Sequence, residues 1–536
     1  MLKKKYIITI ITAPIIVASA TAIGVSYYYS SQKQVYNHYY TTPSSSSNTD
    51  IIQSYLASVV NGAKLLYLPS YVHGVPLTES LNIKKEQNQI LYNYFNKTGF
   101  LLLDSNYGFP VFIEKKDEKG NVIGIDGLDY QQPIWSTNVA AVLFRADLGS
   151  FITGIAAAQL LNENQDYFGT ELTWCTYGGL PFSTVTCFMG GFERGVEFFN
   201  KNIVPLKPEF KEVKKILLNE NQSGNFANGF DPNQADDLIG NLLNMKPSLI
   251  LPVAGPQIGS AARLIRQRNT KTVIIGVDSA IEEDDTVNLP LNGLEPNKNI
   301  GNNKIIQFSS VKNLGDMLNL ITQNINKGKN TPDQNESLEY AHIGGIGYSS
   351  LGTLFNGGVG VSESGKKFFI NAMQILDNTK YDSYMAALKS TNPIYIQILK
   401  NLDLPENKTY SIGSSQTFSY ADITNSGAQM LPIEKSDEEI KKWLNNFYND
   451  KFVDQRFDLI KEWIENNKST IDIRKKLNLT NEFNKQDYLD NKNISRIIFQ
   501  SPTSILFDNS FYQSCYSGLI DYWKQEGIEL PPIPKK

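Results

Sequence analysis

Continuous apolar runs alternate with helical patterns through the middle of the chain, and this alternation restricts the possible folds more than any other feature. Runs such as "SLILPV" and "TVIIGV" hold no alternating polar residues. Strands that are apolar on both faces are typical of parallel sheets covered by helices on both sides. The sequence therefore predicts a doubly wound α/β lobe. Its expected strands lie at 171–177, 213–218, 248–253 and 272–277, and its expected helices at 184–200, 231–244 and 257–268.

An earlier group of apolar runs predicts another lobe of the same class. Between two of these runs, "VFIEKKDEKGNVIGIDGL" has the pattern of a hairpin that turns at Lys119-Gly120-Asn121. A later stretch, 304–328, has the pattern of one more strand and an amphipathic helix, which we assign to this lobe. The expected strands of the lobe lie at 64–69, 99–104 and 139–144.

Composition excludes several classes of function. At 536 residues the chain is longer than one ordinary domain, so two or three domains are expected. The formal net charge is −4 and the lysines are scattered, which argues against a nucleic-acid partner. The 3 cysteines and 3 histidines are too dispersed for a zinc site or a disulfide framework. We therefore expect no metal and no cofactor.

The N-terminus predicts attachment to a membrane. Lysines at positions 3–5 precede an uncharged, mostly apolar run over 6–29, which is long enough to span a bilayer. A cleaved signal peptide is the alternative, because the small residues at 18–20 fit a cleavage site. We favour an uncleaved anchor, since the run exceeds the usual signal core of about 7–15 residues. Either way, the bulk of the chain is expected outside the cytoplasm.

The C-terminal third differs from the rest of the chain in its sequence pattern, which is mostly helical. "SDEEIKKWLNNFY" begins with Ser436 and Glu439 at capping-box spacing and carries apolar residues on one helical face. We therefore expect a mostly helical extension without a chemical signature. The expected domains are an anchor or signal at 1–30, a polar tether at 31–50, a first lobe at 51–165 with 304–328, a second lobe at 166–303 with 344–365, and the extension at 366–536.

A glycine-rich corner in "YGGLPFST" (177–184) is a candidate ligand site. Phosphate-binding loops need a lysine after the second glycine, and none follows Gly178 or Gly179. A nucleophile elbow needs a glycine two residues after the serine, which Ser183 lacks, and only His342 could serve as its base. These absences disfavour a hydrolase. They leave either a corner beside a ligand or an ordinary connection between strand and helix.

Five blocks of sequence become specific when they are taken together and in order. The blocks are "DLGSFITGIAAAQL", "GGLPFSTVTCFMGGFERGVEFFN", "LILPVAGPQIGSA", "VIIGVDSA" and "FSSVKNL". In this order they resemble the basic membrane protein family, the purine nucleoside receptor A-like (PnrA-like) substrate-binding lipoproteins of ABC importers, of the kind found on wall-less bacteria. The resemblance implies a type I periplasmic-binding-protein fold, in which crossing segments join two α/β lobes around a ligand. It implies no enzymatic activity.

The resemblance also implies ligand-binding residues, position by position. Asp278 matches the aspartate that holds ribose hydroxyls in the family, and a carboxylate can accept two such hydrogen bonds. Lys312 matches the lysine of the family's S-x-x-K block. Phe226, with Phe230 as the alternative, matches the phenylalanine that stacks on the base. The further candidates are Gly255, where a ligand would approach the backbone, and Asp104, which ends "FLLLD".

The beginning of the family's first lobe has no counterpart in the N-terminal part of this chain. "AKLLYLPSYVHG" resembles the family's third strand, yet only the tether and one helical pattern at 51–60 precede it. In the family, a strand and loop with a D…S-F-N motif come first and supply the other wall of the pocket. In a sheet ordered 2-1-3-4-5, the loss of the first two strands leaves the third at an edge. We therefore expect an incomplete first lobe.

These observations support two functions of different classes. The first is a membrane-anchored extracellular substrate-binding protein that binds a nucleoside or similar small polar ligand and delivers it to the permease subunits of an ABC importer. The alternative is a surface interaction or antigen-like protein that keeps the scaffold and has a degenerate pocket. The expected absence of the first strands and the long extension favour the alternative.

Overall fold

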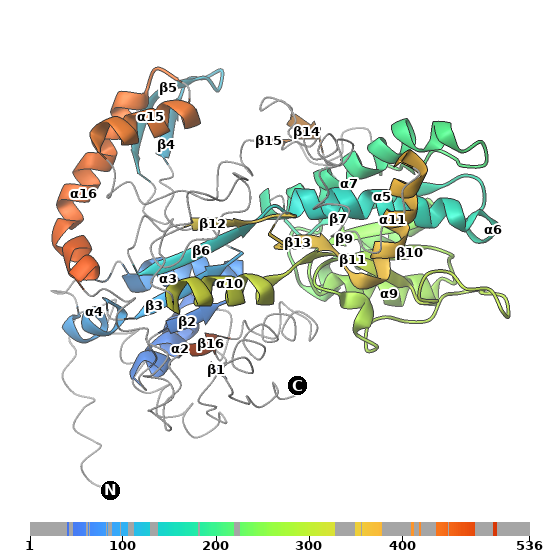
Figure 1. The fold of residues 1–536 in the computed structure, drawn as a ribbon, viewed down its shortest axis with the longest axis horizontal. Helices are drawn as coiled ribbons and strands as arrows, with labels where there is room; N and C mark the ends of the chain where they lie inside the picture. Colours follow the sequence, from blue (N-terminus) through green and yellow to red (C-terminus); the bar gives the residue numbers. More distant parts are fainter. Residues whose placement is uncertain are drawn as a thin grey trace, which may run out of the picture.

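A computed structural model of the chain contains two six-stranded sheets, which lie side by side along its long axis (Figure 1). Each sheet forms the centre of one α/β lobe, so the expected two-lobe α/β architecture is confirmed. The residues that the structure describes are 40–41, 47–60, 63, 65–81, 83, 88–96, 98–104, 112–128, 138–180, 183–218, 226–326, 349–354, 356–377, 409–411, 417–419, 436–448, 450–476 and 497–500.

The sheet of the second lobe has the strand order β13-β11-β10-β9-β7-β8. Strands β7 to β11 pair in parallel, and β13 runs antiparallel to β11. The expected strands are confirmed, although the one predicted at 213–218 is reduced to two residues. The bounds are β7 (Thr173–Gly178), β8 (Lys214–Lys215), β9 (Leu249–Val253), β10 (Val273–Asp278), β11 (Ile306–Lys312) and β13 (Val359–Val361).

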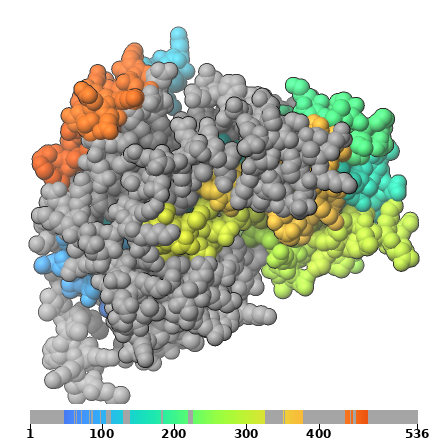
Figure 2. Space-filling model, in the orientation of Figure 1, coloured from blue at the N-terminus to red at the C-terminus, as the bar shows by residue number. Residues whose placement is uncertain are grey.

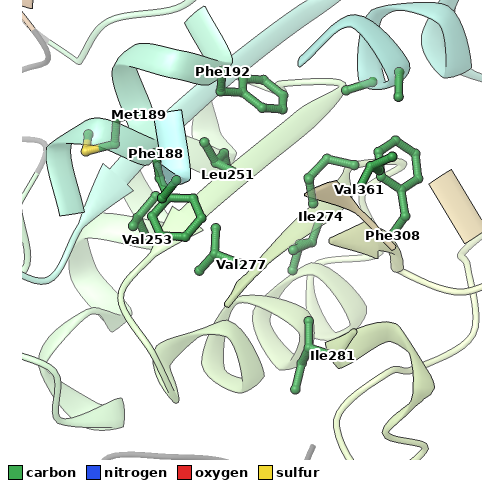
Figure 3. Packing of buried hydrophobic residues seen from close by; sticks show 14 of the residues in the cluster. Phe188, Met189, Phe192, Leu251, Val253, Ile274, Val277, Ile281, Phe308 and Val361 are labelled. Atoms are coloured by element: carbon green, nitrogen blue, oxygen red, sulfur yellow. The ribbon is translucent and has the colours of Figure 1, made fainter. Parts of the chain in front are cut away.

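Helices cover both faces of this sheet (Figure 1). On one face, Phe188 and Phe192 of α7 lie over Leu251 and Val277 of the strands, in a core that is closed to solvent (Figure 3). The helices are α5 (Ala146–Glu163), α6 (Gln165–Phe168), α7 (Ser183–Asn202), α8 (Asp236–Asn244), α9 (Gln257–Gln267) and α11 (Glu363–Asp377). Figure 2 shows residues 249–300 of this lobe, in yellow-green, reaching the surface beside α11, in orange.

The sheet of the first lobe has the order β1-β16-β2-β3-β6-β12, and all of its pairings are parallel. Alternate residues of β2 and β3 enter different cores: Leu66 and Phe100 face the helices α2 to α4, whereas Tyr67 and Leu101 share a cluster with α10. The bounds are β1 (Tyr40–Thr41), α2 (Asn48–Val60), β2 (Leu65–Leu68), α3 (Gly74–Leu81), α4 (Gln89–Asn96), β3 (Gly99–Leu103), β6 (Val139–Phe144), α10 (Leu314–Asn326), β12 (Ser349–Gly352) and β16 (Ile497–Gln500).

The chain passes between the two sheets at three places among the described residues. It leaves β6 for α5 at Arg145, β11 for α10 at Asn313, and β12 for β13 at 353–358. Hydrogen bonds join these crossings: the Arg145 amide donates to the Gly352 carbonyl over 2.8 Å, and the Asn313 amide donates to the Gly358 carbonyl over 2.8 Å. The expected crossing segments therefore exist as a bonded group.

Three expectations about the strands are wrong. The strand of 304–328 was expected in the first lobe, but β11 pairs with β10 in the second sheet, and only α10 lies over the first sheet (Figure 1). Likewise, 344–365 does not return to the second lobe as a unit, because β12 pairs with β6. The strand predicted at 64–69 is also not at an edge, since β16 pairs with β2 on the side away from β3.

The predicted hairpin is confirmed and forms a small module with two C-terminal helices. Its strands pair antiparallel, and Gly120 supplies the left-handed turn with φ 82°. Phe112 and Leu128 of the hairpin share an apolar cluster with Ile460 and Leu444 of the helices. The elements of the C-terminal region and the hairpin are β4 (Phe112–Lys116), β5 (Val122–Leu128), β14 (Thr409–Ser411), β15 (Thr417–Ser419), α15 (Asp437–Tyr448) and α16 (Val453–Lys476). The mostly helical character of 366–536 as a whole stays a prediction.

The contact between α5 and α7 requires glycine, and this makes a prediction about stability. A Cβ at Gly154 would lie 2.3 Å from the Phe192 carbonyl oxygen. We expect Gly154→Ala to lower the free energy of unfolding by about 1–3 kcal/mol, because the two helix backbones must separate. Denaturant unfolding of the purified protein measures this value.

The matched control is Gly259→Ala in α9, where the nearest atom to the added Cβ, Val287 Cγ1, is 3.5 Å away. Alanine is the better helix former, so this variant should gain about 0.5–1 kcal/mol. Equal stabilities of the two variants would contradict the tight helix contact.

Candidate functional site

Candidate residues gather where the parallel strands of the second sheet end. The carboxyl ends of parallel strands lie at one edge of a sheet, where open α/β sheets bind ligands. β10 ends at Asp278 and its neighbour β11 ends at Lys312. Gly255 follows the end of β9, the neighbour of β10 on the other side. Three of the five predicted residues therefore share one edge.

Asp104 joins this edge from the other sheet. It follows β3 of the first lobe, and its Oδ1 lies 2.8 Å from Lys312 Nζ. The same Nζ lies 2.9 Å from Asp278 Oδ1 and 4.9 Å from the centre of the Phe188 ring. Lys312 and Asp104 are buried. We call Asp104, Lys312 and Asp278 the ion cluster; it spans the junction of the two lobes.

The backbone at the ends of these strands is unusual. Asp104 and Asp278 have φ values of 61° and 70°, and Gly255 has a φ of 54°. This left-handed region is uncommon for residues with a side chain, although aspartate tolerates it better than most. Residues held in such conformations concentrate at functional sites. The conformation turns the chain at the point where each strand reaches the junction.

Burial and charge shift the pKa values within the ion cluster. Burial is the largest influence on Asp104 and, with the nearby charge of Asp278, raises its pKa to about 6 against the opposing effect of Lys312. For Lys312, burial alone would lower the pKa, but Asp104 and Asp278 together raise it above its usual value. The lysine therefore stays charged, and Asp104 is the group that titrates near neutral pH.

Asp278 is the member of the ion cluster that solvent can reach. Its side chain is 28% exposed, against 8% for Asp104 and 4% for Lys312. Its Oδ1 is itself buried and is paired with Lys312 Nζ. A partly exposed carboxylate can accept hydrogen bonds from the hydroxyl groups of a polar ligand.

The Gly178 corner serves the packing of two phenylalanine rings. A Cβ at Gly178 would lie 2.8 Å from Phe226 Cε1, and one at Gly179 would lie 2.4 Å from Phe230 Cε1. The Phe226 backbone continues beside the end of β7, through a parallel bridge to Gly178. Phe226 is 9% exposed. Its ring therefore packs on the corner, and a stacking role stays a prediction.

A second charged pair at the junction escaped the sequence analysis. Arg145 follows β6, and its Nε and Nη2 each donate to Asp147 over 3.0 Å. Both side chains are 2% exposed. The signal in the sequence was a charged R-A-D run directly after the apolar strand "VAAVLF". Because the two charges compensate each other, we assign this pair a structural role at the crossing from β6 to α5.

Comparison with known families gives the same relationship as the sequence blocks. Residues 111–351 match the family described as ABC transporter substrate-binding protein PnrA-like. The predicted resemblance is confirmed. The matched residues include the end of β10 and the end of β11, with Asp278 and Lys312.

Curated relatives come from mycoplasmas. The "uncharacterized lipoprotein MG040" of Mycoplasma genitalium is 31% identical over 328 residues, which are 51% of this chain and 51% of the relative. Its homologue in Mycoplasma pneumoniae is 32% identical over 335 residues, 52% of this chain and 47% of the relative. The chain thus spans about half the length of these curated relatives.

Solved structures with a similar fold include solute-binding proteins. An ABC transporter solute-binding protein from Aeropyrum pernix is 14% identical, with a TM-score of 0.37 over 69% of this chain and 83% of that one. Another, from Conexibacter woesei, is 10% identical, with a TM-score of 0.34 over 67% and 91%. These likenesses are weak, so the fold assignment is based on the strand order.

Two further expectations concern a metal site and a membrane span. Among the described residues, no group of acidic, cysteine or histidine side chains could hold a metal ion. No helix within those residues is both long and apolar enough to cross a bilayer. The predicted anchor at 1–30, the tether at 31–39 and His342 lie outside the described residues.

The raised pKa of Asp104 predicts a pH dependence of stability. The carboxyl has an ordinary pKa of 3.8 when unfolded and one of about 6 in the fold. The folded state therefore binds the proton more tightly, so this contribution is fully present below pH 3.8 and is lost as the pH rises through 6. We expect Asp104 to add about 1 kcal/mol to stability on going from pH 7 to pH 5.

Denaturant unfolding of wild type and Asp104→Asn at both pH values isolates this contribution. The neutral amide does not titrate, so the stability gain at pH 5 should be smaller in the variant by about 1 kcal/mol. Parallel pH profiles for the two proteins would contradict the raised pKa. Asp237→Asn, at an exposed position of α8, is the matched control.

Proposed function

We propose that the protein is the substrate-binding component of an ABC importer, anchored to the outer face of the membrane, and that it binds a nucleoside or a similar small polar ligand between its lobes. Asp278 accepts the ligand's hydroxyl groups, and Lys312 holds Asp278 and Asp104 in position. The permease subunits of the importer are the protein partner. This proposal is based on the PnrA-like match and on the ion cluster at the lobe junction.

The observation that carries the proposal is the partly exposed carboxylate of Asp278 at the junction of two lobes. Ribose presents neighbouring hydroxyl donors, and a carboxylate held by a buried lysine is a strong acceptor for both. The ion cluster carries one more negative than positive charge, which suits a ligand that donates hydrogen bonds. The degenerate-pocket alternative makes the opposite prediction, that no nucleoside binds.

Calorimetry on the chain from residue 31 onward distinguishes the two functions. Asp278→Ala should weaken nucleoside binding by roughly ten- to a hundred-fold, since a lost hydrogen bond to a charged group costs about 1.5–3 kcal/mol. Asp237→Ala, which removes an exposed carboxylate of the same lobe, should bind as wild type does. Wild type that shows no heat with millimolar nucleoside would contradict nucleoside binding and favour the alternative.

Membrane attachment by residues 1–30 has its own test. The apolar run over 6–29 should remain in the mature protein, because it is longer than a signal core and has a basic N-terminal flank. N-terminal sequencing of protein purified from membranes should begin within the first few residues. A mature N-terminus near Thr21 or Ile23 would instead show a cleaved signal.

A further inference from the structure

The first sheet contains strands from opposite ends of the chain. β16, from residues 497–500, lies between β1 and β2, with Ile498 opposite Leu66 and Phe499 opposite both Tyr67 and Tyr40. All three strands run in the same direction. Because they are parallel, β16 ends at the edge of the sheet where β3 delivers Asp104. The C-terminal part of the chain therefore returns to the lobe junction.

β2 is built as an interior strand. All four of its side chains are at most 1% exposed, and its other neighbour is β3. Without β16, the backbone groups of β2 on that side would form an open sheet edge. The helix α2, which packs on this sheet, also contacts β16. The C-terminal strand therefore completes the first lobe.

The order of the strands in the first sheet differs from their order along the chain. In a sheet ordered 2-1-3-4-5, the first strand lies between the second and the third. β16 occupies that position, β1 occupies the second, and β2, β3 and β6 occupy the third, fourth and fifth. Along the chain, the strand at the second position comes first and is followed by those at the third, fourth and fifth positions. The strand at the first position comes after all of them. This is the order that a circular permutation produces.

The sequence after β16 agrees with this reading. "SPTSILFDNSFYQS" follows the strand directly and contains Asp508, Ser510 and Phe511. These residue types occur in the order of the D…S-F-N motif that follows the family's first strand. A counterpart in sequence to the motif that the N-terminal part of the chain lacks therefore follows β16, near the other end of the chain.

We propose that the protein is a circularly permuted member of this architecture: β16 is the first strand of the first lobe, moved toward the end of the chain. The first lobe then has a strand at every position of the 2-1-3-4-5 order. The proposal stands on the pairing of β16 with β1 and β2.

Disulfide trapping tests this proposal without a ligand. Neighbouring strands lie about 4.8 Å apart. The Cα atoms of residues opposite each other on them are therefore within the distance range that a disulfide allows. Leu66→Cys with Ile498→Cys, in a Cys515→Ser background, should therefore form a disulfide in the folded protein. Mass spectrometry of the digested, unreduced protein detects the linked peptides.

The matched control pairs Ile498→Cys with Phe100→Cys. Phe100 is opposite Leu66 on β3, so it lies two strand spacings, about 9.6 Å, from Ile498, which is too far for a disulfide. Linkage of the first pair and not the second supports the proposal. Absence of linkage in the first pair, or equal linkage in both, would overturn it.

Discussion

The placement of the two sheets depends on the buried charge of Lys312. Its Nζ lies within 2.9 Å of one carboxylate from each lobe, Asp278 at the end of β10 and Asp104 after β3. A buried ammonium needs such partners, because an uncompensated charge in the interior costs several kcal/mol. The same contact that neutralises the lysine therefore holds the carboxyl edges of the two sheets against each other. The crossing at Asn313 follows the lysine directly, so the charge and the connection act at one place.

The charged side chains at the junction are of two kinds. Some are buried and stabilise the fold, whereas one is partly exposed and could contact a ligand. Arg145 and Asp147 compensate each other through two hydrogen bonds and are closed to solvent. Asp104 is buried, and burial raises the pKa of its carboxyl to about 6. Asp278 is different, because it is partly exposed and is held by a lysine that it shares. A ligand that donates hydrogen bonds to Asp278 would add to the ion cluster without displacing any of its members.

Local sequence patterns predicted most of the helices and strands. They could not predict which strands pair with each other, because that depends on residues far apart in the chain. The apolar runs marked the strands, and the Gly120 turn marked the hairpin, because both signals are local. The partner of β11 was not local: its apolar pattern suits either sheet, and the pairing with β10 placed it in the second. Asp278 and Lys312 were predicted because they match blocks of the family, and Asp104 was predicted because it ends an apolar run. Their contact was not predictable, since it joins residues 208 positions apart.

The first lobe shows why the order of elements along a chain is a poor guide to whether a sheet is complete. A parallel strand is defined by its neighbours, its direction and the edge at which it ends, and none of these depends on which elements precede it in the sequence. β16 meets all three conditions beside β2, where Ile497 lies opposite Leu65. More than four hundred residues separate these two strands in the chain. A search for the first strand ahead of β2 therefore finds nothing. In the proposed permutation β16 is that strand, and its carboxyl end lies on the side of the sheet where Asp104 meets Lys312.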